Sequence, residues 1–279
     1  MKVSGFTFIR NAIKYDFPIL EAITSILPIV DEFIVNVGQS EDDTLGLIRS
    51  IKDERIKIVE NVWDETMKKD GQVLGVQQDI ALSQCTGDWA FLLQGDEVVH
   101  EDDLEIIRSA MERYLGQPHI LGLIFRMVHF KGDYWSVDPW MYRKATRIIR
   151  NNGQIHSTPD CCDFRTIDSP KMLKSGPQGK LITARLFHYG WAKDAQGLRE
   201  KNRQMAKWWH GETLTEQEMD KQAAIVAELP KYDILKEFRK SHPKVMHERI
   251  HGTRHLRRRL NRWLNWRFYR EVVLHGFKG

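Results

Sequence analysis

The amino-acid sequence predicts an α/β protein whose helices cover both faces of a central, mostly parallel sheet. Through roughly the first hundred residues, short apolar runs of strand length alternate with segments whose apolar residues recur at helical spacing. Continuous apolar strands that alternate with helices are typical of parallel sheets buried on both faces. We therefore expect a three-layer α/β/α sandwich followed by a helical C-terminal extension.

The expected elements follow one another in order. Residues 3–10 carry β-branched and aromatic side chains and predict the first strand. Asp16 and Pro18 then predict a helix, with Asp16 as its cap, and Pro28 closes it. Further strands are expected at residues 32–37, 56–60, 89–93, 120–130, 144–151 and 184–191, and further helices at residues 44–52, 71–85, 194–210 and 214–229.

Composition and cysteine content limit the class of protein. Of the 279 residues, 42% are hydrophobic and 29% are charged, which is typical of a soluble globular protein. No apolar run reaches the roughly 20 residues that span a bilayer, and the N-terminal stretch predicts a strand and not a signal peptide. The three cysteines have no C-x-x-C spacing and indicate neither a disulfide framework nor a structural zinc site. A reducing cytoplasm is the expected compartment.

The C-terminal tail is strongly basic, whereas the rest of the chain is mildly acidic. Seven arginines and no acidic residue lie between Arg254 and Arg270, and the remainder holds 35 basic and 38 acidic residues. One helical face would collect the apolar residues Leu256, Leu260, Trp263 and Leu264. Arginines with interleaved aromatic residues suit an anionic membrane surface. A C-terminal helix packed on the body, with solvated arginines, fits the pattern as well. The acidic body disfavours nucleic acid as a partner.

Polar side chains stand where the expected strands end. In open α/β sheets, ligands bind in the crevice at the carboxyl ends of the strands. The polar residues at these ends are Arg10, Asn11, Asn36, Glu60, Asn61, Gln94, Asp96 and Glu97. The sequence has neither a G-x-G-x-x-G after its first strand nor a G-x-x-x-x-G-K-[ST] loop to hold phosphates. Carboxylates such as Asp96 repel phosphates unless a divalent cation such as Mg²⁺ or Mn²⁺ lies between them. These ends therefore favour a metal-bound nucleotide diphosphate over a dinucleotide.

Two segments, FIRNAIKYDFPILEAITSILPIVDEFIVNVGQSEDDT and QQDIALSQCTGDWAFLLQGDE, carry a family resemblance. They resemble family 2 glycosyltransferases of the GT-A fold, in which a D-x-D or D-A-D-E signature ends the fourth strand and binds the metal of a nucleotide-sugar. Gln94-Gly95-Asp96-Glu97 falls on this signature, as in a branch that carries Gln-x-Asp-Glu. The turn FIVNVGQSEDDT is similar to the D-x-G-S-x-D-x-T turn, with Asn36 at the leading Asp, and QDIAL is similar to R-N-x-A-L, with Gln78 at the Arg.

The resemblance implies roles for individual residues. It implies a metal-dependent enzyme with Mg²⁺ or Mn²⁺ as cofactor. Residues 184–191, ARLFHYGW, are similar to a late His-Tyr-Gly segment whose histidine completes the metal shell, which makes His188 a metal candidate beside Asp96. A hydrogen-bonded histidine that merely ends a strand is the alternative for His188. The implied nucleotide-sugar-binding residues are Arg10, Asn11, Asn36, Gln78, Gln94 and Asp96.

Transfer of a sugar to a hydroxyl with inversion also needs a base on the acceptor side. The base should come from the second half of the chain, where Asp160 and Asp138 are the candidates. Asp138 precedes Pro139 and suits the start of a turn, so we favour Asp160 as the catalytic base.

The expected organisation follows from these roles. Residues 1–192 would form the GT-A-like catalytic domain, with the nucleotide-sugar half at about 1–100 and the acceptor half at about 101–192, and residues 193–279 a helical C-terminal region. We expect a hexosyltransferase-type enzyme that moves a sugar from a UDP- or GDP-sugar to a glycan or lipid-linked acceptor in cell-surface glycan or polysaccharide biosynthesis. The tail would hold it at the inner face of the plasma membrane. A non-catalytic nucleotide-sugar-binding protein and a basic-tailed RNA-binding protein are the alternatives.

Overall fold

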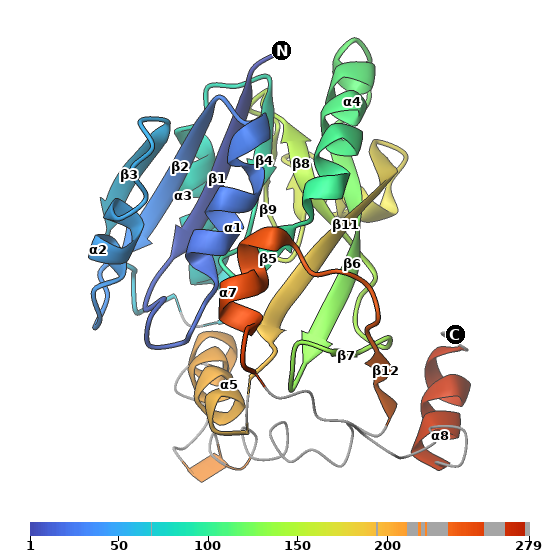
Figure 1. Ribbon diagram of the computed structural model, residues 1–279. Helices are drawn as coiled ribbons and strands as arrows, with labels where there is room; N and C mark the ends of the chain where they lie inside the picture. The colour runs from blue at the N-terminus through green and yellow to red at the C-terminus, as the bar shows by residue number, and fades with distance from the viewer. Residues whose placement is uncertain are drawn as a thin grey trace.

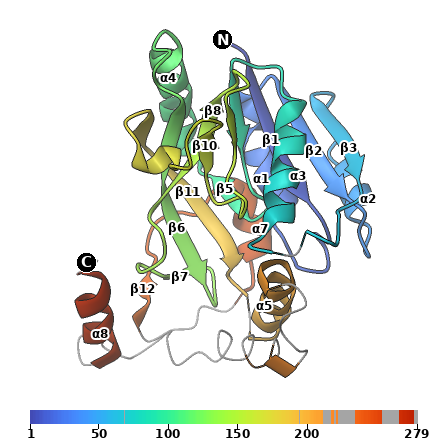
Figure 2. The same ribbon diagram turned by 180° about the vertical axis from the view of Figure 1, so that it is seen from behind.

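The computed structural model describes residues 1–67, 69–193, 195–210, 217–218, 221, 234–253 and 266–276. These residues form the expected α/β fold around one large sheet (Figures 1 and 2). Among them, the sheet has ten strands in the order β12-β7-β6-β8-β4-β1-β2-β3, with β11 beside β6 and β5 beside β11. The fold class predicted from the sequence is confirmed.

The first half of the chain forms parallel strands with helices between them. The strands are β1 (Val3–Ile9), β2 (Glu32–Gly38), β3 (Ile56–Asn61) and β4 (Trp89–Leu92), and the helices are α1 (Ile19–Ile26), α2 (Thr44–Arg49) and α3 (Gln72–Ser83). The expected cap of α1 is wrong, because Pro18 occupies the cap position and no side chain accepts a hydrogen bond there. Asp43 does cap α2, since its carboxylate accepts from the Gly46 N–H.

The second half adds strands of both directions. It contains β5 (Glu97–Val99), α4 (Leu104–Leu115), β6 (Gly122–Lys131), β7 (Ser136–Val137), β8 (Lys144–Arg150), the hairpin of β9 (Ile155–Ser157) and β10 (Phe164–Thr166), and β11 (Gly179–Trp191). Strand β8 runs antiparallel to both β4 and β6, and β11 runs parallel to β6. Strands β1, β4, β6 and β11 therefore point the same way, and their carboxyl ends lie at one edge of the sheet.

Apolar side chains fill both faces of this sheet. One core cluster joins α1 and α4 to the sheet through Ile23, Ile107 and Phe125, and another joins α3 to the opposite face through Ala81, Leu82 and Phe6. Helices α1 and α3 accordingly lie in front of and behind the strands in Figure 1. This is the expected three-layer sandwich, and its buried strands explain the continuous apolar runs in the sequence.

The described elements that follow residue 192 include segments that pack on the body. Helix α5 (Ala195–His210) lies beyond the carboxyl edge of the sheet, β12 (Lys236–Glu237) pairs with β7, and α7 (His247–Ile250) follows. Met246 and Ile250 share a core cluster with Phe130 and Phe187. Arg249 forms an ion pair with Glu21 of α1.

The C-terminal stretch is described only in part. Helix α8 (Trp266–His275) lies near the C-terminus, and its Phe268 contacts Trp140. The apolar face expected at Leu256, Leu260, Trp263 and Leu264, and most of the helix expected at residues 214–229, lie outside the described residues. Among the described residues, no helix has the length and apolar character needed to cross a membrane.

Candidate functional site

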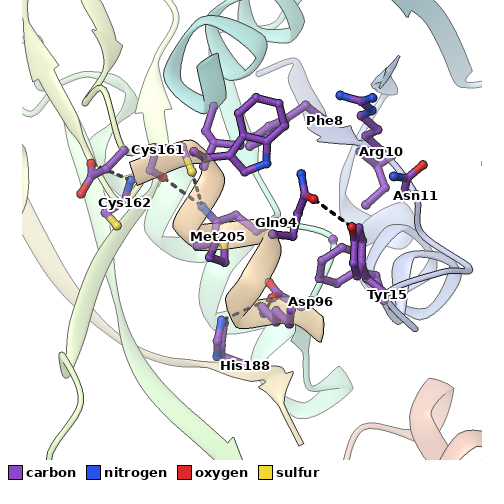
Figure 3. Close-up of a pocket in the computed structure, with 18 of the residues that line it drawn as sticks. Phe8, Arg10, Asn11, Tyr15, Gln94, Asp96, Cys161, Cys162, His188 and Met205 are labelled. Carbon is purple, nitrogen blue, oxygen red and sulfur yellow. Dashed lines mark hydrogen bonds and ion pairs between the residues drawn. The ribbon is translucent and has the colours of Figure 1, made fainter. Parts of the chain in front are cut away.

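A cavity of about 270 Å³ opens at the carboxyl edge of the sheet (Figure 3). Its walls come from the end of β1, from residues 94–96 after β4, from the loop 160–162, from the end of β11 and from α5. Parallel strands place these segments together, because their carboxyl ends share one edge. Six of the residues singled out in the sequence line this cavity: Arg10, Asn11, Gln94, Asp96, Asp160 and His188.

Asp96 lies between β4 and β5 with its carboxylate directed into the cavity (Figure 3). Its Oδ2 atom is 2.9 Å from Lys201 Nζ and 3.6 Å from His188 Nε2. Burial alone would raise the pKa of Asp96, but the ammonium of Lys201 holds the pKa well below its usual range. Gly190 makes this approach possible, since a Cβ at that position would collide with Asp96 Oδ2 and Lys201 Nζ.

His188 is oriented by a second histidine, His129. The parallel register of β6 and β11 pairs these two residues, and their Nδ1 atoms lie 3.2 Å apart. His129 Nε2 lies 2.6 Å from the Tyr142 carbonyl oxygen. Because a carbonyl can only accept, His129 Nε2 carries the hydrogen and Nδ1 of a neutral His129 accepts one from His188 Nδ1. The network therefore assigns a free lone pair to His188 Nε2, on the side of Asp96.

Burial keeps both imidazoles neutral. It lowers the pKa of His129 to about 4 and the pKa of His188 to about 3. Two hydrogen-bond acceptors, Asp96 Oδ2 and His188 Nε2, thus face each other across 3.6 Å. A carboxylate oxygen beside a neutral imidazole nitrogen, whose other nitrogen is hydrogen-bonded, is a donor set that fits a divalent cation. Within the described residues, no third imidazole, thiol or carboxylate completes a three-ligand group with this pair.

Glu97 has a different role from its neighbour Asp96. Its carboxylate accepts two hydrogen bonds of 2.8 Å from Arg147 Nε and Nη2, and both side chains are fully buried. Arg147 also donates to the Cys162 carbonyl oxygen at 3.0 Å. The two adjacent acids of the signature therefore have different roles. Asp96 faces the cavity, whereas Glu97 holds Arg147 and thereby links β5 to β8 and to the loop that carries Asp160.

Asp160 lies in a tight loop that borders the cavity. Gln94 Nε2 donates to the Cys161 carbonyl at 2.9 Å, and Cys161 adopts a positive φ of 54°. Burial would raise the pKa of Asp160, but hydrogen bonds from Thr158 and Cys162 lower it, so the carboxyl is ionised at neutral pH. The other candidate base, Asp138, does not line the cavity. It pairs with Lys131 at 3.2 Å and accepts from the Trp140 N–H, as expected of a turn.

Arg10 and Asn11 form the wall at the end of β1. Arg10 pairs with Glu65 at 2.7 Å, and its guanidinium lies 5.7 Å from the centroid of the Trp63 ring. Asn11 has a positive φ of 55° and exchanges hydrogen bonds with Glu41: its Oδ1 accepts from the Glu41 N–H, and its Nδ2 donates to the Glu41 carboxylate. The turn that resembles the family motif is thereby tied to the cavity wall.

Two predicted donor-binding residues do not line the cavity. Asn36 lies inside β2, which continues to Gly38, one residue beyond the predicted end of that strand. Its amide donates to the carbonyl and side-chain oxygens of Gln77 at 2.9 Å. Gln78 is also fully buried, and neither atom of its side-chain amide has a hydrogen-bond partner among the described residues. Both amides are buried and lie outside the cavity lining.

Helix α5 supplies a wall that the sequence did not reveal. It brings Lys201, Gln204, Met205 and Trp208 to the cavity. Gln204 accepts a hydrogen bond from the Tyr15 hydroxyl at 3.1 Å, and Trp208 packs on Trp63 at 5.7 Å between ring centroids. His129 could have been found as a polar residue ending an apolar strand, whereas nothing in the helical pattern of residues 194–210 distinguishes Lys201.

Comparison with known proteins finds one distant sequence relative. The chain is 26% identical over 212 residues to an uncharacterized glycosyltransferase of Rickettsia typhi (strain ATCC VR-144 / Wilmington). The match covers 72% of this chain and 64% of the relative, so the chain spans less than two thirds of the relative's length. No protein-family model matches the chain.

Solved structures show weaker similarities. TarS 1-349 from S. aureus, in complex with UDP-GlcNAc, has a TM-score of 0.44 and 16% identity over 80% of this chain and 70% of its own. Glucosyl-3-phosphoglycerate synthase from Mycobacterium tuberculosis, in complex with Mn²⁺, UDP and glucosyl-3-phosphoglycerate, has a TM-score of 0.32 and 21% identity over 47% of this chain and 45% of its own. Similarities at this level carry no information about function.

Proposed function

We propose that this protein is a glycosyltransferase that moves a sugar from a nucleotide-diphosphate donor, UDP- or GDP-linked, to a hydroxyl of an acceptor. The observation that carries the proposal is a pair of atoms that could bind a divalent cation. Asp96 Oδ2 and His188 Nε2 lie 3.6 Å apart in a cavity at the carboxyl edge of the sheet. The relative from Rickettsia typhi, named a glycosyltransferase, supports it. The signature Gln94-Gly95-Asp96-Glu97 would then be the Gln-x-Asp-Glu variant of the family motif.

The donor would bind along the wall formed by β1 and residues 94–96. Arg10, Asn11, Gln94 and Asp96 line this wall and would contact the nucleotide-sugar. Asn36 and Gln78, which are buried and do not line the cavity, would support the donor site without touching the donor. The indole of Trp63 lies beside Arg10 and offers an apolar surface next to these polar groups.

Asp96 and His188 would hold Mg²⁺ or Mn²⁺. When bound, the cation supplies a Lewis acid that stabilises charge on the departing diphosphate. His129 would not coordinate the cation. It fixes the tautomer of His188 and so keeps the lone pair of His188 Nε2 directed at the site. Diphosphate oxygens and water would fill the remaining positions, as is usual for these cations.

Asp160 would act as the general base on the acceptor hydroxyl. Its carboxylate is ionised and borders the same cavity as Asp96. A base that is separate from the donor's metal site suits direct displacement at the sugar carbon, and hence inversion. The hexosyltransferase type remains part of the proposal. Helix α5 closes one side of the cavity and would limit the access of water to the donor.

The acceptor would be a glycan or a lipid-linked molecule in cell-surface glycan or polysaccharide biosynthesis. The seven arginines between Arg254 and Arg270 support a peripheral position on the anionic inner face of the plasma membrane, with the catalytic domain in the cytoplasm.

Hydrolysis of a panel of UDP- and GDP-sugars with Mn²⁺ tests the proposed function. We expect slow hydrolysis of one donor by the full chain, and none in the presence of a chelator. Tight binding of a donor with no hydrolysis and no transfer would favour the non-catalytic nucleotide-sugar-binding protein. If no donor is bound or hydrolysed, the proposed function is wrong.

A further inference from the structure

Lys201 of α5 holds the carboxylate oxygen that a bound cation would need. We infer that Lys201 changes partners during donor binding: its ammonium neutralises Asp96 in the empty site and transfers to the donor's diphosphate when a divalent cation takes Asp96. The inference rests on the proposed function, because it assigns Lys201 to the diphosphate of that same donor.

The ammonium of Lys201 occupies a built position. Its Nζ lies 2.9 Å from Asp96 Oδ2 and 3.0 Å from the Gly190 carbonyl oxygen, and it lies 4.8 Å from the centroid of the Trp191 ring. Only 7% of the residue is exposed. The missing Cβ of Gly190 leaves the space in which Asp96 and Lys201 meet. A lysine held this firmly is part of the site and not a solvated surface charge.

A cation between Asp96 and His188 would compete directly with this lysine. The same atom, Asp96 Oδ2, accepts from Lys201 Nζ and faces His188 Nε2. A divalent cation bound to that oxygen places two positive charges a few ångströms from the ammonium, and like charges at this separation repel strongly in a buried site. Cation binding therefore weakens the Asp96–Lys201 ion pair.

The displaced ammonium then needs another anion. Asp96 is the one carboxylate within ion-pair distance of Lys201 in the part of the chain that the structure describes. Its other contacts are a neutral carbonyl and the rings of Trp191 and Phe17, and a buried charge without a counter-charge is costly. The diphosphate would arrive together with the cation in the cavity that Lys201 itself lines. It is the anion that fits.

Calorimetry of Lys201→Met tests the exchange of partners. The exchange predicts that the substitution raises the affinity for Mn²⁺ alone and lowers the affinity for UDP or GDP in the presence of Mn²⁺. Without the competing ammonium, Mn²⁺ alone should bind on the order of tenfold tighter than to the unchanged protein. In saturating Mn²⁺, UDP or GDP should bind on the order of tenfold more weakly, because the diphosphate loses its ammonium. Lys131→Met is the control, because Lys131 is a largely buried lysine that pairs with Asp138 outside the cavity. It should leave both affinities nearly unchanged.

The outcomes separate the inference from the proposed function. If Lys201→Met shifts both affinities in the same direction, or shifts neither, the exchange is wrong. If the unchanged protein binds Mn²⁺ but neither UDP nor GDP, the proposed function fails, while the Mn²⁺ measurement still reports on competition at Asp96. Lys201→Gln provides the same comparison should Lys201→Met not fold, and Lys201→Arg, which keeps the charge, should retain nucleotide affinity.

Discussion

Arg147 and Glu97 form a bidentate ion pair in which neither side chain is exposed to solvent. Glu97 belongs to the strand that follows Asp96, and Arg147 belongs to β8 and also holds the Cys162 carbonyl. The pair therefore connects the two segments that carry Asp96 and Asp160. A buried pair of this kind gains little over apolar residues, but the loss of one partner leaves an uncompensated charge.

Glu97→Gln should destabilise the protein strongly. Removing one partner of a buried ion pair costs about 3–5 kcal/mol in the free energy of unfolding. Urea denaturation measures this change. Glu60→Gln is the control, because the exposed Glu60–Arg49 pair should be worth about 1 kcal/mol or less. Equal effects of the two substitutions would contradict a structural role for Glu97.

Asp96→Asn should abolish metal-dependent nucleotide binding. The substitution removes the carboxylate charge that we assign to the cation, while the side chain keeps its size. Calorimetry of UDP and GDP with and without Mn²⁺ measures the effect. Asp138→Asn, which changes a carboxylate outside the cavity, should bind as the unchanged protein does. Nucleotide binding that is equally tight in chelator, or intact in Asp96→Asn, would remove the metal mechanism.

Asp160→Asn should slow transfer while donor binding changes little. Loss of a general base lowers kcat by about 10² to 10⁴-fold. Steady-state transfer rates and UDP affinity, measured on the same protein, separate the two effects. A large rate loss in Asp138→Asn, with none in Asp160→Asn, would show that the base was assigned to the wrong carboxylate.

His129→Phe should weaken Mn²⁺ binding although His129 does not face the cation. Phe cannot accept the hydrogen bond from His188 Nδ1, so the His188 tautomer is no longer fixed. Loss of such a supporting group typically lowers metal affinity by about 10 to 100-fold. His242→Phe is the matched control, because His242 is a buried histidine that bonds the Tyr189 hydroxyl away from the cavity. Unchanged Mn²⁺ affinity in His129→Phe would contradict the tautomer assignment.

Glu32 should contribute to the loss of stability in acid. Burial alone would raise its pKa, but hydrogen bonds from Lys57, Ser4 and Thr86 lower the pKa of Glu32 from 4.5 to about 2. Because the pKa is lower in the folded state, the stabilisation is complete above about pH 4.5 and is lost as the pH falls towards about 2. In Glu32→Gln, the free energy of unfolding measured by urea should depend less on pH in this window. A curve parallel to that of the unchanged protein would refute this contribution.

The sandwich, and the edge of the sheet at which the site lies, can be predicted from the amino-acid sequence alone. Strands buried on both faces are largely apolar along their whole length. Residues 89–93 and 32–37 show this pattern, whereas in the neighbouring segments the apolar residues recur at helical spacing. Polar residues within a few positions after such a strand, such as Gln94 and Asp96, lie at the carboxyl edge of a parallel sheet whatever the later topology. These features depend on residues close together in the sequence, so they can be predicted without knowledge of the tertiary structure.

Which of these residues act together depends on how distant segments of the chain pack in the folded protein. The register of β6 against β11 sets His129 beside His188, and a helix 105 residues along the chain from Asp96 delivers Lys201. Two adjacent acids, Asp96 and Glu97, point to different partners because Arg147 of β8 takes one of them. Side-chain periodicity along a segment fixes which face is apolar, but it does not encode which distant segment packs there. Pairings between remote strands and helices arise from the packing of the whole core.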